Sequence, residues 1–153
     1  MVLVARDGVV LLFEFESTPG RIERQMRSRF GDVDLQGATN PFGISDQIRA
    51  YFDGDIHAID NILTDGGGSE FEGQVWAELR KIPAGTTVSY GEIARKLGDV
   101  QLSRAVGNAN GRNPIAIIVP CHRVIGADRS MTGYGGGLKN KEWLLRHEGA
   151  LLI

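Results

Sequence analysis

The stretch SYGEIARKLGDVQLSRAVGNAN, residues 89–110, is typical of two short helices joined by a tight turn. Ser89 is followed three residues later by Glu92, and this capping box predicts the start of a helix. Gly98 is expected to end that helix, and a second helix is expected from about Leu102 to Asn110. The pattern indicates a helix-turn-helix, although an ordinary helical corner carries the same local signals.

Upstream of this motif, three consecutive glycines mark a change in organisation. The segment TDGGGSE, residues 64–70, favours no regular element and is predicted to be a linker. Ser69 and Glu72 form a second capping box, which predicts another helix directly after the linker. We therefore expect two domains, residues 1–66 and residues 67–153.

The first domain is predicted to be a small α/β unit. Apolar segments at residues 2–6 and 9–15 flank an Asp-Gly pair, which indicates a β-hairpin. Helices are expected from Pro19 to Phe30 and from Pro41 to Phe52, each followed closely by a glycine.

The second domain is predicted to be mainly helical. The run NPIAIIVP, residues 113–120, is continuous, rich in β-branched residues and bounded by prolines, so a buried strand is expected, with Cys121 just past its end. A glycine-rich loop at residues 132–138 then leads to a final helix near residues 139–147. The fold class of the whole chain is therefore predicted to be α/β.

The composition limits the class of protein. With 153 residues, 42% of them hydrophobic, the chain can close a core without disulfides. Its longest N-terminal apolar run, VVLLF, is far too short for a signal peptide or a membrane span, so we expect a cytoplasmic protein without membrane contact. The single cysteine and three histidines lack zinc-ligand spacing, and we expect neither a metal nor a cofactor.

The net charge of -2 hides an asymmetry. Residues 1–83 carry 8 Lys and Arg against 14 Asp and Glu, whereas residues 84–153 carry 9 against 5. A polyanionic partner is expected to meet the C-terminal half, where the field is attractive. A chance distribution of solvated charges would give the same numbers.

Cys121 is a candidate nucleophile because a histidine stands directly beside it. A thiol attacks as the thiolate, and His122 is the nearest base in sequence. Neighbouring side chains on an extended backbone point to opposite faces, so the proton transfer needs a turn or a water. The carboxylates near enough in sequence to orient the histidine are Asp128, Glu142 and Glu148. The alternative is that Cys121 is an inert core residue.

Four separated segments carry a family resemblance. SRAVGNANGRNP, IVPCHRVIG, TGYGGG and KEWLLRHEG closely resemble the O6-alkylguanine-DNA alkyltransferase family, also called methylated-DNA–protein-cysteine methyltransferase, from about Phe71 to Gly149. The PCHRV pentad is the most specific element. The resemblance implies a small ribonuclease-H-like N-terminal domain and a C-terminal domain that is mainly helical and winged-helix-like.

The resemblance also implies the chemistry. Cys121 would take a methyl or other alkyl group from O6 of guanine, and from O4 of thymine, in one irreversible and stoichiometric step. His122 would accept the thiol proton through a water, Glu148 would orient His122, and Asn113 would fix the turn that carries the cysteine. His147, next to Glu148, is expected to be a surface or capping residue in the last helical turn.

The implied partner is double-stranded DNA, docked through its minor groove, with the damaged nucleotide rotated out of the stack. Arg104 would fill the vacated place, and Tyr90 would crowd the target phosphate and bond guanine N3. The expected DNA-binding residues are Tyr90, Arg95, Lys96, Arg104, Ala105, Gly107 and Arg112. The expected pocket residues are Tyr90, Val124, Tyr134, Gly135 and Gly136, with the carbonyl groups of Cys121 and Val124 accepting from the guanine amino group.

Two departures from the family pattern stand out. Some relatives carry a larger side chain where this chain has Gly135, so we expect a roomier pocket and a looser loop. Family members usually have a further strand with an SPLG-like turn before the segment that starts here at Val2, so the N-terminal domain is expected to lack an edge strand. We expect a monomer that associates with the nucleoid through DNA.

Two other functions remain alternatives. A non-catalytic alkyltransferase-like protein would bind the lesion without reacting, but such proteins replace the cysteine that this chain keeps at Cys121. A sequence-specific transcription regulator would need base-reading side chains on its recognition helix, and LSRAVGNANG offers mostly small ones.

Overall fold

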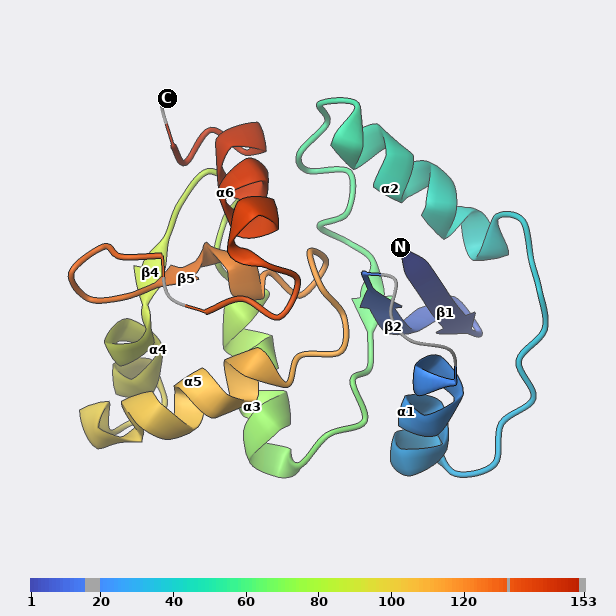
Figure 1. Ribbon diagram of the computed structural model, residues 1–153, viewed down its shortest axis with the longest axis horizontal. Coiled ribbons are helices and arrows are strands. Elements are labelled where there is room, and N and C mark those ends of the chain that lie inside the picture. The colour runs from blue at the N-terminus through green and yellow to red at the C-terminus, as the bar shows by residue number, and fades with distance from the viewer. Residues whose placement is uncertain (16–19, 132, 152–153) are drawn as a thin grey trace.

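The computed structural model describes residues 1–15, 20–131 and 133–151, and these form a mixed α/β protein (Figure 1). A hairpin with two helices makes up one side of the molecule, and the remaining helices make up the other (Figure 1). One hydrophobic cluster contains buried residues from both sides, among them Val10, Tyr51, Val75 and Val106.

The predicted hairpin is confirmed. Strands β1 (Val2–Arg6) and β2 (Val9–Glu14) pair antiparallel across a two-residue turn, in which Asp7 and Gly8 both have positive φ, at 53° and 80°. The other edge of β2 pairs in parallel with the short strand β3 (Leu63–Thr64). Strand β2 is therefore the central strand, which explains its run of four buried residues.

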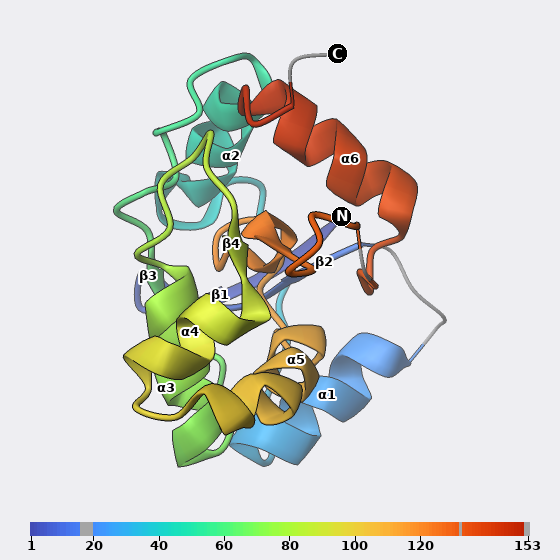
Figure 2. The same cartoon turned by 90° about the vertical axis from the view of Figure 1, so that its left-hand side faces the viewer.

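Helices α1 and α2 lie on opposite sides of this sheet (Figures 1 and 2). Helix α1 (Arg21–Phe30) is followed by Gly31, as predicted, and the expected start at Pro19 lies outside the described residues. The single helix predicted from Pro41 to Phe52 is wrong at its start, because Phe42 has a left-handed φ of 56°. A 3-10 turn, η1 (Pro41–Gly43), therefore precedes α2 (Ile44–Phe52).

The glycine segment predicted as a linker has no helix or strand from residue 65 to residue 69, but it is tightly packed. A Cβ atom would lie 2.3 Å from a ring carbon of Trp76 at Gly66 and 2.5 Å from one at Gly68. At Gly67 it would lie 2.7 Å from the ring of Phe30. These glycines therefore allow two aromatic rings to approach the backbone, rather than serving mainly as a flexible connection.

Both capping boxes are confirmed, and so is the helix pair that they predicted. Helix α3 (Glu70–Leu79) starts after Ser69, and helix α4 (Tyr90–Lys96) starts after Ser89, each with both reciprocal hydrogen bonds. A short turn, η2 (Val100–Leu102), then leads to α5 (Ser103–Gly111). Helices α4 and α5 pack together and lie beside α3 (Figures 1 and 2).

The strand predicted at residues 113–120 is wrong, although residues 114–120 are all buried. Only Ile115 forms a bridge, with Phe13 at the end of β2. The backbone then turns, since the amide of Ile118 donates to the carbonyl of Ala116 at 2.7 Å, and Ile117 adopts a φ of 69° that β-branched residues rarely adopt. Cys121 consequently opens a 3-10 turn, η3 (Cys121–Arg123), instead of following a strand.

The C-terminal elements complete the fold. Strand β5 (Val124–Ile125) pairs in parallel with β4 (Val88–Ser89), and α6 (Leu138–His147) confirms the predicted last helix. Among the described residues, no helix combines the length and the apolar character that a membrane span requires.

Candidate active site

Cys121 lies in the wall of a cavity of about 150 Å³. Its side chain is nearly buried, with 6% of the residue exposed. The cavity combines the end of β2, the end of α5, the turn before the cysteine and the glycine-rich loop; its lining residues are Glu14, Phe15, Asn110, Gly111, Asn113, Ala116, Cys121, Gly133, Tyr134, Gly135 and Gly136. The cavity therefore gathers segments from both halves of the chain around one thiol.

Asn113 holds the turn that presents the cysteine. Its side-chain Nδ2 donates to the carbonyl groups of Ile115 and Val119, at 3.3 and 2.8 Å, and its Oδ1 accepts from the amide of Ile115 at 3.0 Å. These side-chain bonds take the place of ladder hydrogen bonds, which explains why an apolar run forms a turn instead of a strand.

His122 is paired with Glu148, one of the three carboxylates that the sequence left open. The distance from His122 Nε2 to Glu148 Oε1 is 2.9 Å, and both side chains are fully buried. Asp128 instead accepts from the amide of Ser130, and Glu142 pairs with Arg146 on the surface of α6.

The protonation of this pair follows from its surroundings. Burial opposes the charge on Glu148, but the hydrogen bonds from His122 and Arg123 outweigh it and lower the pKa of the carboxyl group to about 2. Glu148 is therefore an ionised acceptor, and His122 Nε2 carries the hydrogen. Burial also lowers the pKa of His122, which leaves a neutral imidazole whose Nδ1 is buried and has no hydrogen-bond partner among the described residues.

The thiol of Cys121 does not ionise readily in its buried position. Burial raises the pKa of Cys121, while the hydrogen bond from Asn113 and the nearby charge of Lys141 act in the opposite direction. Lys141 is fully buried, and its Nζ donates to the carbonyl of Val124 at 2.6 Å. Because burial has the largest effect, the cysteine rests as a thiol and requires a base.

Three buried residues of this site were missed by the sequence reasoning: Tyr51, Arg123 and Lys141. Arg123 donates from Nε to Glu148 Oε2 at 2.9 Å and from Nη2 to Glu148 Oε1 at 2.8 Å. Their places in the PCHRV pentad and in the KEWLLRHEG segment could have drawn attention to Arg123 and Lys141, whereas nothing near Tyr51 in the sequence links it to the cysteine.

The expected pocket residues divide into two groups. Tyr134, Gly135 and Gly136 line the cavity, whereas Tyr90 and Val124 do not. The ring of Tyr134 forms a wall and meets Phe15 edge-on, with 6.2 Å between ring centroids.

The glycine-rich loop is open at one position and tightly packed at the next. A Cβ atom at Gly135 would meet nothing within 4 Å, which agrees with a roomier pocket. A Cβ atom at Gly136 would lie 2.3 Å from a ring carbon of Phe15, so the backbone at Gly136 packs closely on this ring.

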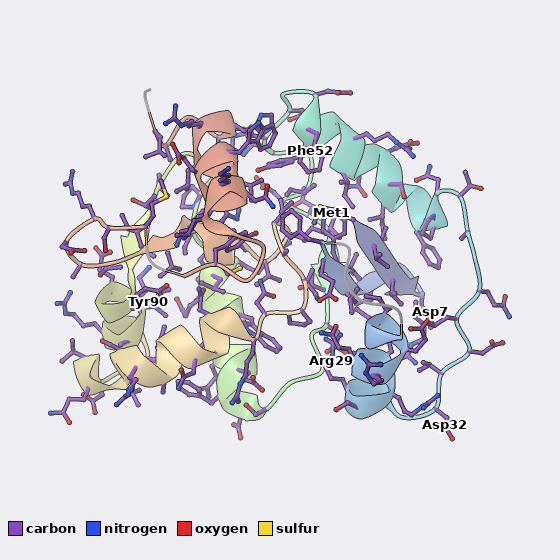
Figure 3. The ribbon with its side chains drawn as sticks, in the orientation of Figure 1. Met1, Asp7, Arg29, Asp32, Phe52 and Tyr90 are labelled. Carbon is purple, nitrogen blue, oxygen red and sulfur yellow. The ribbon has the colours of Figure 1, made fainter. Side chains whose placement is uncertain are left out.

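The expected DNA-binding residues lie outside the cavity, on and after α4 and α5. Figure 3 shows Tyr90 on α4, and a Cβ atom at Gly107 of α5 would lie 3.9 Å from its ring. The four basic residues of this set are all exposed: Arg95, Lys96, Arg104 and Arg112. Ala105 is partly buried on α5.

His147 lies in the last turn of α6, as expected of a surface or capping residue there, but its expected surface position is wrong. The ring is partly buried, its Nε2 lies 2.6 Å from the carbonyl oxygen of Tyr51, and it stacks on Trp143 with 4.7 Å between centroids. The end of α2 packs against α6, so this histidine links the two helices.

A buried cysteine with a histidine–glutamate pair, placed beside a helix-turn-helix, defines a protein that joins nucleophilic chemistry to a nucleic-acid-binding motif. Comparison with known proteins gives the family. A family model described as "6-O-methylguanine DNA methyltransferase, DNA binding domain" matches residues 70–150. This chain therefore belongs to the methylated-DNA–protein-cysteine methyltransferase family.

Individual relatives support the same family assignment. A methylated-DNA–protein-cysteine methyltransferase of Shigella flexneri is 56% identical over 116 residues, covering 76% of this chain and 68% of that protein. A Salmonella typhimurium protein of the same name is 48% identical over 142 residues, covering 92% and 83%. The structure of Mycobacterium tuberculosis OGT in complex with DNA is similar, with a TM-score of 0.75 and 39% identity over 96% of this chain and 84% of that chain.

Proposed function

We propose that this protein repairs DNA by direct reversal, transferring a methyl or other alkyl group from O6 of guanine to Cys121. The observation that carries the proposal is the nearly buried thiol in a small cavity, next to a histidine whose other side is held by a buried carboxylate. The family name and the DNA complex of a relative with 39% identity support the substrate. The same chemistry extends to O4-alkylthymine.

The proton path uses His122 and Glu148. His122 Nδ1 takes the thiol proton through a water, and Glu148, which accepts from His122 Nε2, stabilises the resulting imidazolium. The thiolate then attacks the alkyl carbon, so that a carbon–sulfur bond forms and the carbon–oxygen bond breaks, with the electron pair remaining on guanine O6. A proton restores the N1–H form of guanine, and the net change is the exchange of the thiol proton for the alkyl group.

Each molecule reacts once. The product is a thioether, which has no exchange route back to the thiol, in contrast to a disulfide. The chain holds only one cysteine, so no second thiol of its own can remove the alkyl group. The protein is thus consumed by the repair.

The DNA-binding role is assigned to the helix-turn-helix. A thiol that is only 6% exposed cannot reach a base inside the duplex, so the damaged nucleotide must leave the stack. We assign Arg104 to the vacated place, Tyr90 to the target phosphate, and the small residues Ala105 and Gly107 to close approach in the minor groove. The exposed residues Arg95, Lys96 and Arg112 supply further phosphate contacts.

We also propose that the chain has the two-domain architecture of the family. Residues 1–66 would form the family's ribonuclease-H-like unit, and residues 67–153 the winged-helix-like unit, a division supported by the family model starting at residue 70. The protein would act as a monomer on chromosomal DNA in the cytoplasm.

The test separates transfer from binding. Wild-type protein should acquire a labelled methyl group from a duplex containing O6-methylguanine, and Cys121→Ala should acquire none while still binding that duplex, because the thiol supplies chemistry and the helix-turn-helix supplies affinity. Transfer to Cys121→Ala would refute the assignment of the nucleophile. Binding without transfer by the wild type would favour the non-catalytic lesion binder.

A further inference from the structure

We propose that Tyr51, on helix α2 of the N-terminal half, is a positioning residue for alkyl transfer. Its hydroxyl group donates to Glu148 Oε1 at 2.7 Å, across 97 positions of sequence. That oxygen also holds His122 Nε2 at 2.9 Å. The inference rests on the proposed function, and it makes the N-terminal half a contributor to the proton path.

The geometry gives Tyr51 an effect on the base. Glu148 Oε1 accepts from the Tyr51 hydroxyl group, His122 Nε2 and Arg123 Nη2, so three donors share one carboxylate oxygen. Each donor draws on the same negative charge. The strength of the Tyr51 bond therefore sets how much of that charge stabilises the imidazolium form of His122.

Helix α2 is built to hold this hydroxyl group in place. Tyr51 is fully buried, its carbonyl oxygen contacts His147 Nε2 at 2.6 Å, and its ring meets the His147 ring edge-on, with 5.0 Å between centroids. Phe52 is labelled in Figure 3 where α2 meets α6, and the centroid of its ring lies 5.9 Å from that of Trp143. Helix α6 ends with the site carboxylate as its C-terminal cap, so docking of α2 on α6 aligns the donor with Glu148.

The other ionisable groups around the pair come from several elements. They are Tyr51 on α2, Cys121 and Arg123 on η3, Tyr134 in the glycine-rich loop, and Lys141 and His147 on α6. A buried tyrosine hydroxyl group usually finds some partner, so a purely structural bond is the competing explanation. The two explanations differ in what happens to the pH dependence of transfer.

The direction of the expected shift in the pH profile follows from the role of His122 as the base. His122 must be neutral to take the thiol proton, so the rate falls as the pH drops through its pKa. Removing the Tyr51 hydroxyl group leaves more of the Glu148 charge for the imidazolium and raises the pKa of His122. Tyr51→Phe should therefore move the acid limb of the rate profile to higher pH, by about half a unit.

The experiment measures single-turnover methyl transfer from duplex DNA against pH. The matched control is Ile44→Val, a buried residue of the same helix and the same core, whose side chain has no atom that can join the hydrogen bonds of the site. Ile44→Val should lower the unfolding midpoint and keep the wild-type pH profile. A Tyr51→Phe variant that behaves in the same way would overturn the proposal, whereas a wild type that transfers nothing would overturn the function itself.

A second measurement tests the proposal in case the Tyr51→Phe variant fails to fold. Site-specific replacement of Tyr51 by a ring-fluorinated tyrosine keeps the ring and the hydroxyl group but strengthens the donor. The acid limb should then move to lower pH, opposite to the effect of Tyr51→Phe. An unchanged profile in the fluorinated protein would refute a positioning role.

Discussion

Glu148→Gln should remove a pH-dependent part of the stability of this protein. The pKa of the Glu148 carboxyl group falls from its ordinary value of 4.5 to about 2 in the folded protein. At about 1.4 kcal/mol for each pKa unit, this corresponds to about 3 kcal/mol of stability from the charged carboxylate. The side chain is fully buried, so solvent screening takes little from this figure.

The sign of the pH dependence is fixed by the direction of that pKa change. A lowered pKa in the folded state means that the contribution is complete above pH 4.5 and disappears as the pH falls towards 2. The neutral amide of the variant has no such dependence. Moreover, Glu148→Gln leaves Arg123 buried without its counter-charge, which adds to the loss of stability at neutral pH.

The assay is urea unfolding of the wild type and Glu148→Gln between neutral pH and pH 3. The stability difference should be at least about 3 kcal/mol at neutral pH and should shrink steadily below pH 4.5. Glu142→Gln is the matched control, because its surface pair with Arg146 is half exposed and should contribute little at any pH. A difference for Glu148→Gln that stays constant with pH would refute the buried, ionised carboxylate.

Further predictions concern DNA and the glycine-rich loop. Single-turnover rates for Arg104→Ala should fall much more on a duplex than on free O6-methylguanine, because rotating the damaged base out of the stack costs a few kcal/mol in a duplex and nothing for a free base. Equal losses on both substrates would place Arg104 in the pocket or the fold. Duplex affinity should weaken as salt rises, despite the net charge of -2, and a titration without salt dependence would argue against a basic DNA face. Gly136→Ala should cost about 1–3 kcal/mol in urea unfolding because its Cβ would overlap Phe15, whereas Gly135→Ala should cost little; equal effects would contradict the packing described for this loop.

Local signals in the sequence predicted local structure well. The two capping boxes, the Asp-Gly turn and the glycines after helices each depend on residues within a few positions of one another, and the structure confirms the elements that they predicted. The helix-turn-helix follows from the same signals.

Predictions failed where distant or unusual contacts decide the structure. The run at residues 113–120 has the composition of a strand, but Asn113 supplies the hydrogen bonds of a turn and Ile117 adopts a left-handed conformation. The pairing of His122 with Glu148 could be chosen among three carboxylates only through the family resemblance. The bond from Tyr51 to Glu148 joins residues 97 positions apart, and no local pattern reports such a contact.

Alkyl transfer to Cys121 can be measured by intact mass after the protein is mixed with an excess of duplex containing O6-methylguanine, followed by peptide mapping. Each molecule should gain the mass of one CH₂ group and no more, and the methyl group should map to Cys121. An unchanged mass, repeated gains on one chain, or a methyl group on any other residue would contradict a single transfer to Cys121.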